Sequence, residues 1–201
     1  MAGITQLEAV NLALTSAGAT PITSLENNQP DVLSIKTLLE ATRRQIQARG
    51  WWFNRESGIV LSPDQQGHVI VPANTLHVDS TTRSDAFVLR GTKLYDRQNH
   101  TFVIGASVTI DTIILLGFDD LPYNAQNAIQ FKSAMRFVGG DDGDAQEFQR
   151  LKIEYDEAFA ELKRENLRAN DHTIRSNPMV ARVMHRRTNR TTTRFGGAAG
   201  Q

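Results

Sequence analysis

The chain has 201 residues, with 22 basic and 22 acidic side chains and no cysteine. A chain of this length forms one large domain or two small ones and can bury roughly 70% of its unfolded surface, so it needs no metal or disulfide to fold. The absence of cysteine excludes disulfide scaffolds, thiol nucleophiles and thiolate metal sites, and it fits assembly in a reducing cytosol.

The charges are distributed unevenly along the chain. Residues 172–201 contain six arginines and no acidic residue, so this C-terminal arm carries +6 and the remaining residues carry −6. The arginines of the arm are Arg175, Arg182, Arg186, Arg187, Arg190 and Arg194. Spread arginines bind phosphate or pair with carboxylates across an interface. We therefore expect the arm to dock on another chain or on nucleic acid, with a solvated tail as the alternative.

The N-terminal segment predicts an amphipathic helix rather than a signal peptide. It lacks a basic region followed by an apolar one, and no window of the chain approaches the roughly 20 apolar residues of a membrane span. Thr5 and Glu8 match a capping box, and Gly18 with Pro21 marks the end of the helix. We expect a soluble protein that is made without export.

A second helix is predicted from Pro30 to Gly50. Proline suits the first helical turn because its missing N–H would have no partner there, and glycine suits the end. Apolar residues recur between them at helical spacing, namely Val32, Ile35, Leu39 and Ile46. The first two helices should pack as an antiparallel pair.

The middle of the chain changes to a strand-like period. Short β-branched or aromatic runs broken by turn residues predict strands at residues 59–61, 68–71, 86–90, 93–96, 101–104 and 108–116. Gly91 and Thr92 lie between two of these runs, which predicts a two-residue hairpin. The sequence therefore predicts a small antiparallel sheet inserted between helices.

Two further helices are predicted after the sheet. Asp119 and Asp120 can cap a helix that runs from about residue 122 to the glycines at 139 and 140. Asp141, Asp142 and Asp144 precede a final helix over residues 144–170, whose positive end favours anions. That helix would be about 40 Å long, more than a compact core requires, so we expect part of it to pack on a neighbouring chain.

No pattern of catalytic or ligand-binding residues stands out. The five histidines lack metal-ligand spacing, no G-x-S-x-G motif is present, and the glycines match no nucleotide-binding loop. The acid clusters at 119–120 and 141–144 could suggest a glycosidase pair, but helix capping explains both. We expect no catalytic residue, no metal and no cofactor.

An aromatic cluster follows the second helix. Trp51, Trp52 and Phe53, flanked by Arg49 and Arg55, could stack nucleic-acid bases, but such clusters more often anchor a helix on a sheet, and we favour a core role. Adjacent residues of a strand point to opposite sides, so at least one tryptophan should be partly exposed or at a subunit contact. Trp51 and Trp52 are therefore candidate contacts with a partner chain, in addition to the arm arginines.

The segment around this cluster resembles the tail tubular protein A family, the head-to-tail adaptors or gatekeepers of short-tailed bacteriophages. The residues that carry the resemblance are Arg44, Gln45, Ile46, Gln47, Arg49, Gly50, Trp51, Phe53, Asn54, Gly58, Ile59 and Leu61. Further similar stretches lie at residues 9–26, 93–97, before 119–122 and at 132–162, and the likeness ends near residue 171.

The resemblance implies a structural virion protein. Similar proteins form a dodecameric ring between the portal and the tail nozzle made by tail tubular protein B, and the tail fibres attach at that junction. The expected location is the virion tail, after assembly in the host cytoplasm, with genomic DNA passing through without sequence-specific binding. The resemblance brings no active site and no cofactor, and an acidic wall would let DNA slide. The alternatives are a phage tail glycan hydrolase and a DNA-binding protein that acts through the arm.

The expected fold class is α+β. An antiparallel helical bundle holds a small antiparallel sheet between its second and third helices, followed by a long C-terminal helix and an extended arm. The expected domains are a discontinuous helical domain over residues 1–50 and 118–171, a small β domain over 51–117 and the basic arm over 172–201.

Overall fold

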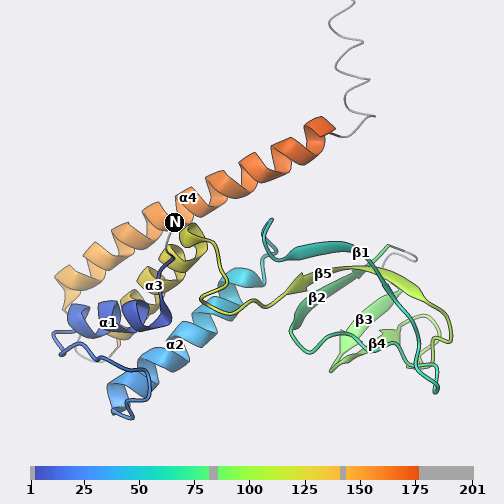
Figure 1. The fold of residues 1–201 in the computed structure, drawn as a ribbon, viewed down its shortest axis with the longest axis horizontal. Helices are drawn as coiled ribbons and strands as arrows, with labels where there is room; N and C mark the ends of the chain where they lie inside the picture. Colours follow the sequence, from blue (N-terminus) through green and yellow to red (C-terminus); the bar gives the residue numbers. More distant parts are fainter. Residues whose placement is uncertain (1–2, 82–85, 141–143, 177–201) are drawn as a thin grey trace, which may run out of the picture. The chain divides into compact units, whose positions relative to one another are not determined.

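The computed structural model describes residues 3–81, 86–140 and 144–176, which fold into four helices and five strands. The helices are α1 (Gln6–Ser16), α2 (Pro30–Gln47), α3 (Tyr123–Val138) and α4 (Ala145–Ser176). The strands are β1 (Arg55–Leu61), β2 (Thr75–Ser80), β3 (Phe87–Arg90), β4 (Lys93–Asp96) and β5 (Val108–Ile114). All five strands lie between α2 and α3 in the chain, which confirms the α+β class (Figure 1).

The chain divides into two compact units, Met1–Leu162 and Lys163–Gln201, and α4 contributes to both. This helix continues to Ser176, beyond the predicted end at residue 170. Its extension is physically reasonable because residues 145–177 contain no proline or glycine. Pro178 disfavours helix only at the residue that precedes it. Arg175 therefore belongs to α4 rather than to an irregular arm, and the other five arm arginines lie outside the described residues.

The helices of the first unit surround one hydrophobic core. α1 and α2 contact each other, and each contacts α3 more extensively. The α4 residues Leu151, Ala158 and Leu162 close the same core. The capping box of α1 is confirmed, because the Thr5 hydroxyl accepts the Glu8 N–H at 3.2 Å while the Glu8 carboxylate accepts the Thr5 N–H at 2.7 Å.

The strands form two antiparallel sheets around a second core. One sheet has the order β1-β5-β2, and the other is the hairpin β3-β4. Arg90 pairs with Lys93 across Gly91, whose φ of 64° confirms the predicted two-residue turn. The second core lies between the sheets and contains Val69, Val71, Val78, Ala86, Phe87, Leu94, Val108 and Ile110.

Two of the predicted strands are wrong and one strand was missed. Residues 68–71 and 101–104 form only isolated bridges, such as His68 with Val103 and Ile70 with Lys93, because they cross neighbouring segments briefly. The missed strand is β2, whose sequence TLHVDS carries a histidine and an aspartate on its outward positions. Its inward positions, Val78 and Ser80, are the buried ones.

Candidate functional site

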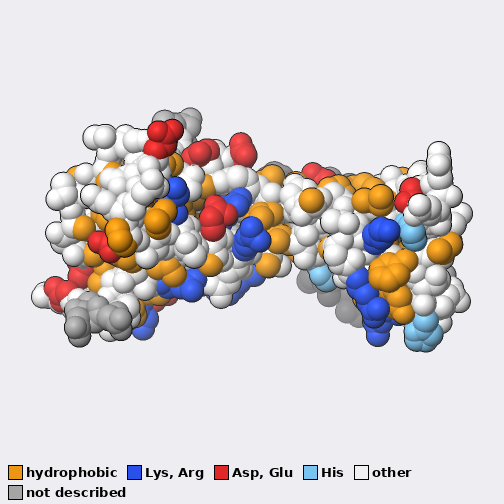
Figure 2. Space-filling model, turned by 90° about the horizontal axis from the view of Figure 1, so that it is seen from below, with side chains coloured by type: hydrophobic (Ala, Val, Ile, Leu, Met, Phe, Trp, Pro, Cys, Tyr) orange, Lys and Arg blue, Asp and Glu red, His pale blue; other side chains and the backbone are white. Residues whose placement is uncertain are grey.

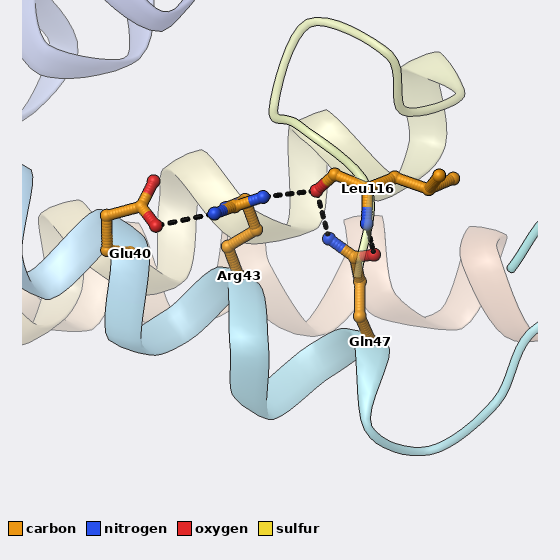
Figure 3. A network of polar contacts seen from close by, with 4 residues as sticks. All are labelled: Glu40, Arg43, Gln47 and Leu116. Atoms are coloured by element: carbon orange, nitrogen blue, oxygen red, sulfur yellow. Dashed lines mark hydrogen bonds and ion pairs between the residues drawn. The ribbon is translucent and has the colours of Figure 1, made fainter. Parts of the chain in front are cut away.

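The residues that carry the family resemblance lie where the helices meet the sheets. α2 ends at Gln47, the chain turns over residues 50–54 into β1, and the segment after β5 returns to the helices. The Gln47 side chain is fully buried. Its Nε2 donates to the Leu116 carbonyl at 3.0 Å and its Oε1 accepts the Leu116 N–H at 2.8 Å (Figure 3). The Gln47 amide thus forms hydrogen bonds with both backbone polar groups of Leu116, as a residue of a neighbouring strand would.

Arg43 reinforces the same contact one turn earlier in α2. Its guanidinium donates to the Leu116 carbonyl and, at 2.6 Å, to the Glu40 carboxylate (Figure 3). A charged donor to a carbonyl is stronger than a neutral one, and the carboxylate balances the partly buried guanidinium. The end of α2 is therefore tied to the returning segment by two side chains.

Asn54 joins the turn, the helix end and the sheet. Its fully buried side chain accepts the Trp51 N–H at 2.8 Å and donates to the carbonyls of Gln47 at 3.0 Å and Ile114 at 2.9 Å. In addition, the Ile114 N–H donates to the Asn54 carbonyl at 2.9 Å. One amide thus fixes three segments of backbone, and the sequence offered no signal for this role beyond its place in the resemblance.

Gly50 allows the chain to leave α2 at this point. Its φ is +70°, and a Cβ added there would lie 2.7 Å from Cδ1 of Ile113 on β5. A side chain would therefore meet both backbone strain and a collision with the sheet. The predicted stop at this glycine is confirmed, since α2 ends three residues earlier.

The two tryptophans have different environments. Trp51 is only 5% exposed, donates from Nε1 to the Ile46 carbonyl at 2.7 Å and meets the Phe159 ring edge-on at 5.9 Å. Trp52 is half-buried beside Phe53. The expected core role and partial exposure are confirmed, but the residues lie in a turn rather than on a strand. Their contact with a partner chain stays a prediction.

Cations and aromatic rings attach α4 to the end of α2 and to α3. The Arg49 guanidinium lies 4.8 Å from the Phe159 ring centre, and the Lys132 ammonium lies 5.4 Å from that of Tyr155. Burial, followed by the nearby charges of Arg49 and Arg136, lowers the pKa of Lys132. Burial likewise raises the pKa of the Tyr155 phenol. The Arg49 guanidinium therefore contacts an aromatic ring of its own chain, that of Phe159.

The acidic clusters have structural partners that differ from those expected. Asp119 accepts the Gln6 N–H at 3.1 Å, so it serves the start of α1, whereas α3 begins at Tyr123 after the N-cap residue Pro122 and has no side-chain cap. The prediction that Asp119 and Asp120 cap α3 is therefore wrong. Asp144 accepts the Gln146 N–H at 2.8 Å and caps α4 as predicted. Asp141 and Asp142 lie outside the described residues.

The described part of the chain has neither a metal-binding cluster nor a membrane-spanning helix. Within residues 3–81, 86–140 and 144–176, no group of three or more histidine, aspartate or glutamate side chains could hold a metal ion. Over the same ranges, no helix is both long and apolar enough to cross a bilayer.

Comparison with known proteins matches nearly the whole chain. A family model described as Tail tubular protein matches residues 7–189. The chain is also 27% identical over 157 residues to the Tail tubular protein A of Klebsiella phage KP34, an alignment that covers 73% of this chain and 82% of that protein. The family match extends past residue 171, where the resemblance was expected to end, and includes four arm arginines, Arg175, Arg182, Arg186 and Arg187.

Proposed function

The chain belongs to the tail tubular protein family, and from this membership we propose that it is a subunit of the adaptor ring that joins the portal to the tail nozzle of a short-tailed bacteriophage. The family match over residues 7–189 carries this proposal, because it spans the helices, both sheets and most of the arm. Membership makes the chain a phage tail protein. The ring, its position and its partners are the proposed part.

The hydrogen-bonded junction supports a role in joining two different assemblies. A subunit that joins the portal to the nozzle must keep the helical and β parts of its first unit in a fixed relative orientation. Gln47 and Asn54 bind both chain crossings between helices and sheets. Because these side chains are fully buried, water does not compete for their hydrogen bonds. The junction is thus built to resist bending between the helical and β parts of the first unit.

The charge distribution supports a channel through which DNA passes without being bound. The residues before the arm carry −6, and the α4 residues Asp156 and Glu157 are exposed on the side opposite the buried Leu151 and Leu162. Carboxylates repel phosphate, so a wall that bears them lets DNA slide. We place this face of α4 at the channel or its rim, and we assign the basic arm to a neighbouring copy or to the portal.

The remaining parts of the proposal follow the family resemblance. The ring is dodecameric, the nozzle partner is tail tubular protein B, and the tail fibres attach around the junction. The protein acts in the virion tail after assembly in the host cytoplasm, without a cofactor and without catalysis. The glycan hydrolase alternative is disfavoured because Asp119 and Asp144 serve as helix caps.

Native mass measurement of the purified full chain, alone and with portal protein, tests the proposal. The expected result is a ring of many copies, or a ring that forms on the portal. A protein that stays monomeric at every concentration and does not bind the portal would contradict the proposal.

A second measurement addresses the arm separately. Replacing all six arm arginines with serine should weaken ring formation or portal docking, while replacing them with lysine, which keeps the charge, should preserve most of it. If the serine variant assembled normally with the same salt sensitivity, the proposed role of the arm would be wrong.

A further inference from the structure

The β part of the first unit is a two-layer sandwich whose outer faces point in opposite directions. Neighbouring residues of a strand alternate between the two sides of a sheet. Val78, Val108 and Ile110 point inward from the three-stranded sheet, while Phe87 and Leu94 point inward from the hairpin. The residues between them form two separate outer surfaces, one on each sheet.

The outer surface of the hairpin is basic and aromatic. We call it the cationic face, and it comprises Arg90, Lys93, Tyr95 and the adjoining His68, Ile70, Phe102 and Val103. The Arg90 guanidinium lies 3.6 Å from the Tyr95 ring centre, and that ring meets Phe102 edge-on at 4.9 Å. Figure 2 shows basic, histidine and hydrophobic side chains over the β part, with a few acidic side chains among them.

The cationic face also exposes aliphatic surface. Ile70 is 52% exposed and Val103 is 55% exposed, beside the charged groups. The Lys93 ammonium lies 3.3 Å from Nδ1 of His68. One acid, Asp64, adjoins this face: its carboxylate accepts the backbone N–H of His68 at 2.8 Å and lies 3.6 Å from Nδ1 of the same residue. Exposed apolar groups rimmed by charge are typical of a protein contact surface.

The outer surface of the three-stranded sheet is acidic. We call it the acidic face, and its centre is Asp79 on β2 directly opposite Asp111 on β5. Both lie at a hollow of about 390 Å³, which is also lined by Ala48, Arg55, His77, Thr112 and Ile113. Val60 adds a side chain on β1 that is 63% exposed. The Asp111 carboxylate accepts the Gly58 N–H at 2.8 Å, which leaves its second oxygen for another donor.

The opposed carboxylates favour a cation from outside the subunit. Like charges directly opposite on neighbouring strands destabilise a sheet. Arg55 lies at the end of the hollow near the helices, where its guanidinium approaches Gly50. A guanidinium or ammonium ion that entered the hollow would relieve the repulsion between Asp79 and Asp111, and an apolar neighbour would cover Val60.

We propose that the cationic face of one copy packs against the acidic face of the next copy in the ring. This inference rests on the proposed adaptor ring and assigns its subunit contact. Because the two faces differ, the contact is head to tail, and repetition of such a contact closes a ring when the rotation fits. Arg90 and Lys93 supply cations for Asp79 and Asp111, while Ile70 and Val103 meet Val60. Complementary charge fixes the direction of the contact, and the apolar groups add burial.

Variants that reverse one face at a time test the proposal. The first variant carries Arg90→Glu and Lys93→Glu, and the second carries Asp79→Lys and Asp111→Asn, where asparagine retains the acceptor for Gly58. A control carries Arg44→Glu and Lys152→Glu, two exposed residues of α2 and α4, and has the same net charge as the first variant. Circular dichroism and thermal unfolding establish that each variant is folded.

Each face variant should require at least about a tenfold higher concentration than the wild type to form rings, because close charge pairs across interfaces contribute strongly. An equimolar mixture of the two variants should associate at concentrations where neither variant does so alone, since each pair of unlike chains retains one intact contact. The control should assemble as the wild type does. Where the wild type forms rings only on the portal, the same comparison is made with portal present.

The possible failures are distinguishable. Wild-type protein that never assembles overturns the adaptor ring and this inference together. Wild-type rings with normal assembly of the face variants overturn only the assigned contact. Equal loss in the control, or a mixture that stays monomeric, overturns it as well, because net charge or another surface would then explain the loss.

Discussion

Replacing Asn54 with alanine should lower the free energy of unfolding by about 3 kcal/mol, because three hydrogen bonds of roughly 1 kcal/mol each are lost. The bonds join its side chain to Trp51, Gln47 and Ile114 at 2.8 to 3.0 Å. The Gln47 carbonyl keeps a second donor, the Gly50 N–H at 3.0 Å, which moderates the loss at that end. The Trp51 N–H loses its acceptor inside the protein, where water does not replace it.

Urea unfolding at a fixed protein concentration measures this effect. Fluorescence of the two tryptophans reports on the junction, and far-ultraviolet circular dichroism reports on the helices. The midpoint should fall without a change in the denaturant slope, and the thermal midpoint should fall by roughly 6 to 12 °C for a chain of this size. Asn28→Ala is the matched control, because Asn28 is exposed and its loss should stay within about 0.5 kcal/mol. A loss below about 1 kcal/mol for Asn54→Ala would show that these bonds do not hold the junction together.

Three further changes test other parts of the fold. Gly50→Ala should destabilise by about 2 kcal/mol through strain at φ +70° and collision with β5, while Gly18→Ala, at φ +75° in open space, should cost about 1 kcal/mol, so similar thermal midpoints for the two would refute the collision. Asp119→Ala removes an acceptor for the first turn of α1 and should cost about 1 kcal/mol in urea unfolding, whereas no loss would remove that capping role. The Thr5 backbone N–H and then its hydroxyl hold the pKa of Glu8 below its ordinary 4.5, so this contribution is present above that pH and is lost as pH falls through the lowered pKa. Glu8→Gln should therefore reduce the stability lost below about pH 4.5 in acid titrations followed by circular dichroism, and an unchanged acid transition would contradict this.

Several features followed from short stretches of sequence because the interactions that create them are short in range. The capping box joins residues three apart, and the β3-β4 hairpin depends on two residues at its turn. β2 escaped prediction because its outward positions carry a histidine and an aspartate, and its burial is decided by β5 on one side and the hairpin layer on the other. Residues 68–71 have the composition of a strand but meet their neighbours only at single bridges.

The sequence alone determined the class of the protein: helices around an inserted sheet, a basic arm after an acidic body, and a resemblance that the family match confirms. Tertiary structure decided which groups meet. Asp119 reaches Gln6 across 113 positions of sequence, and Gln47 reaches Leu116 across 69. Such pairs depend on how separated segments return to one another, a path set by the packing of two cores. Local propensity determines the elements, but only their packing places a donor beside a distant acceptor and puts opposite charges on opposite faces of the sandwich.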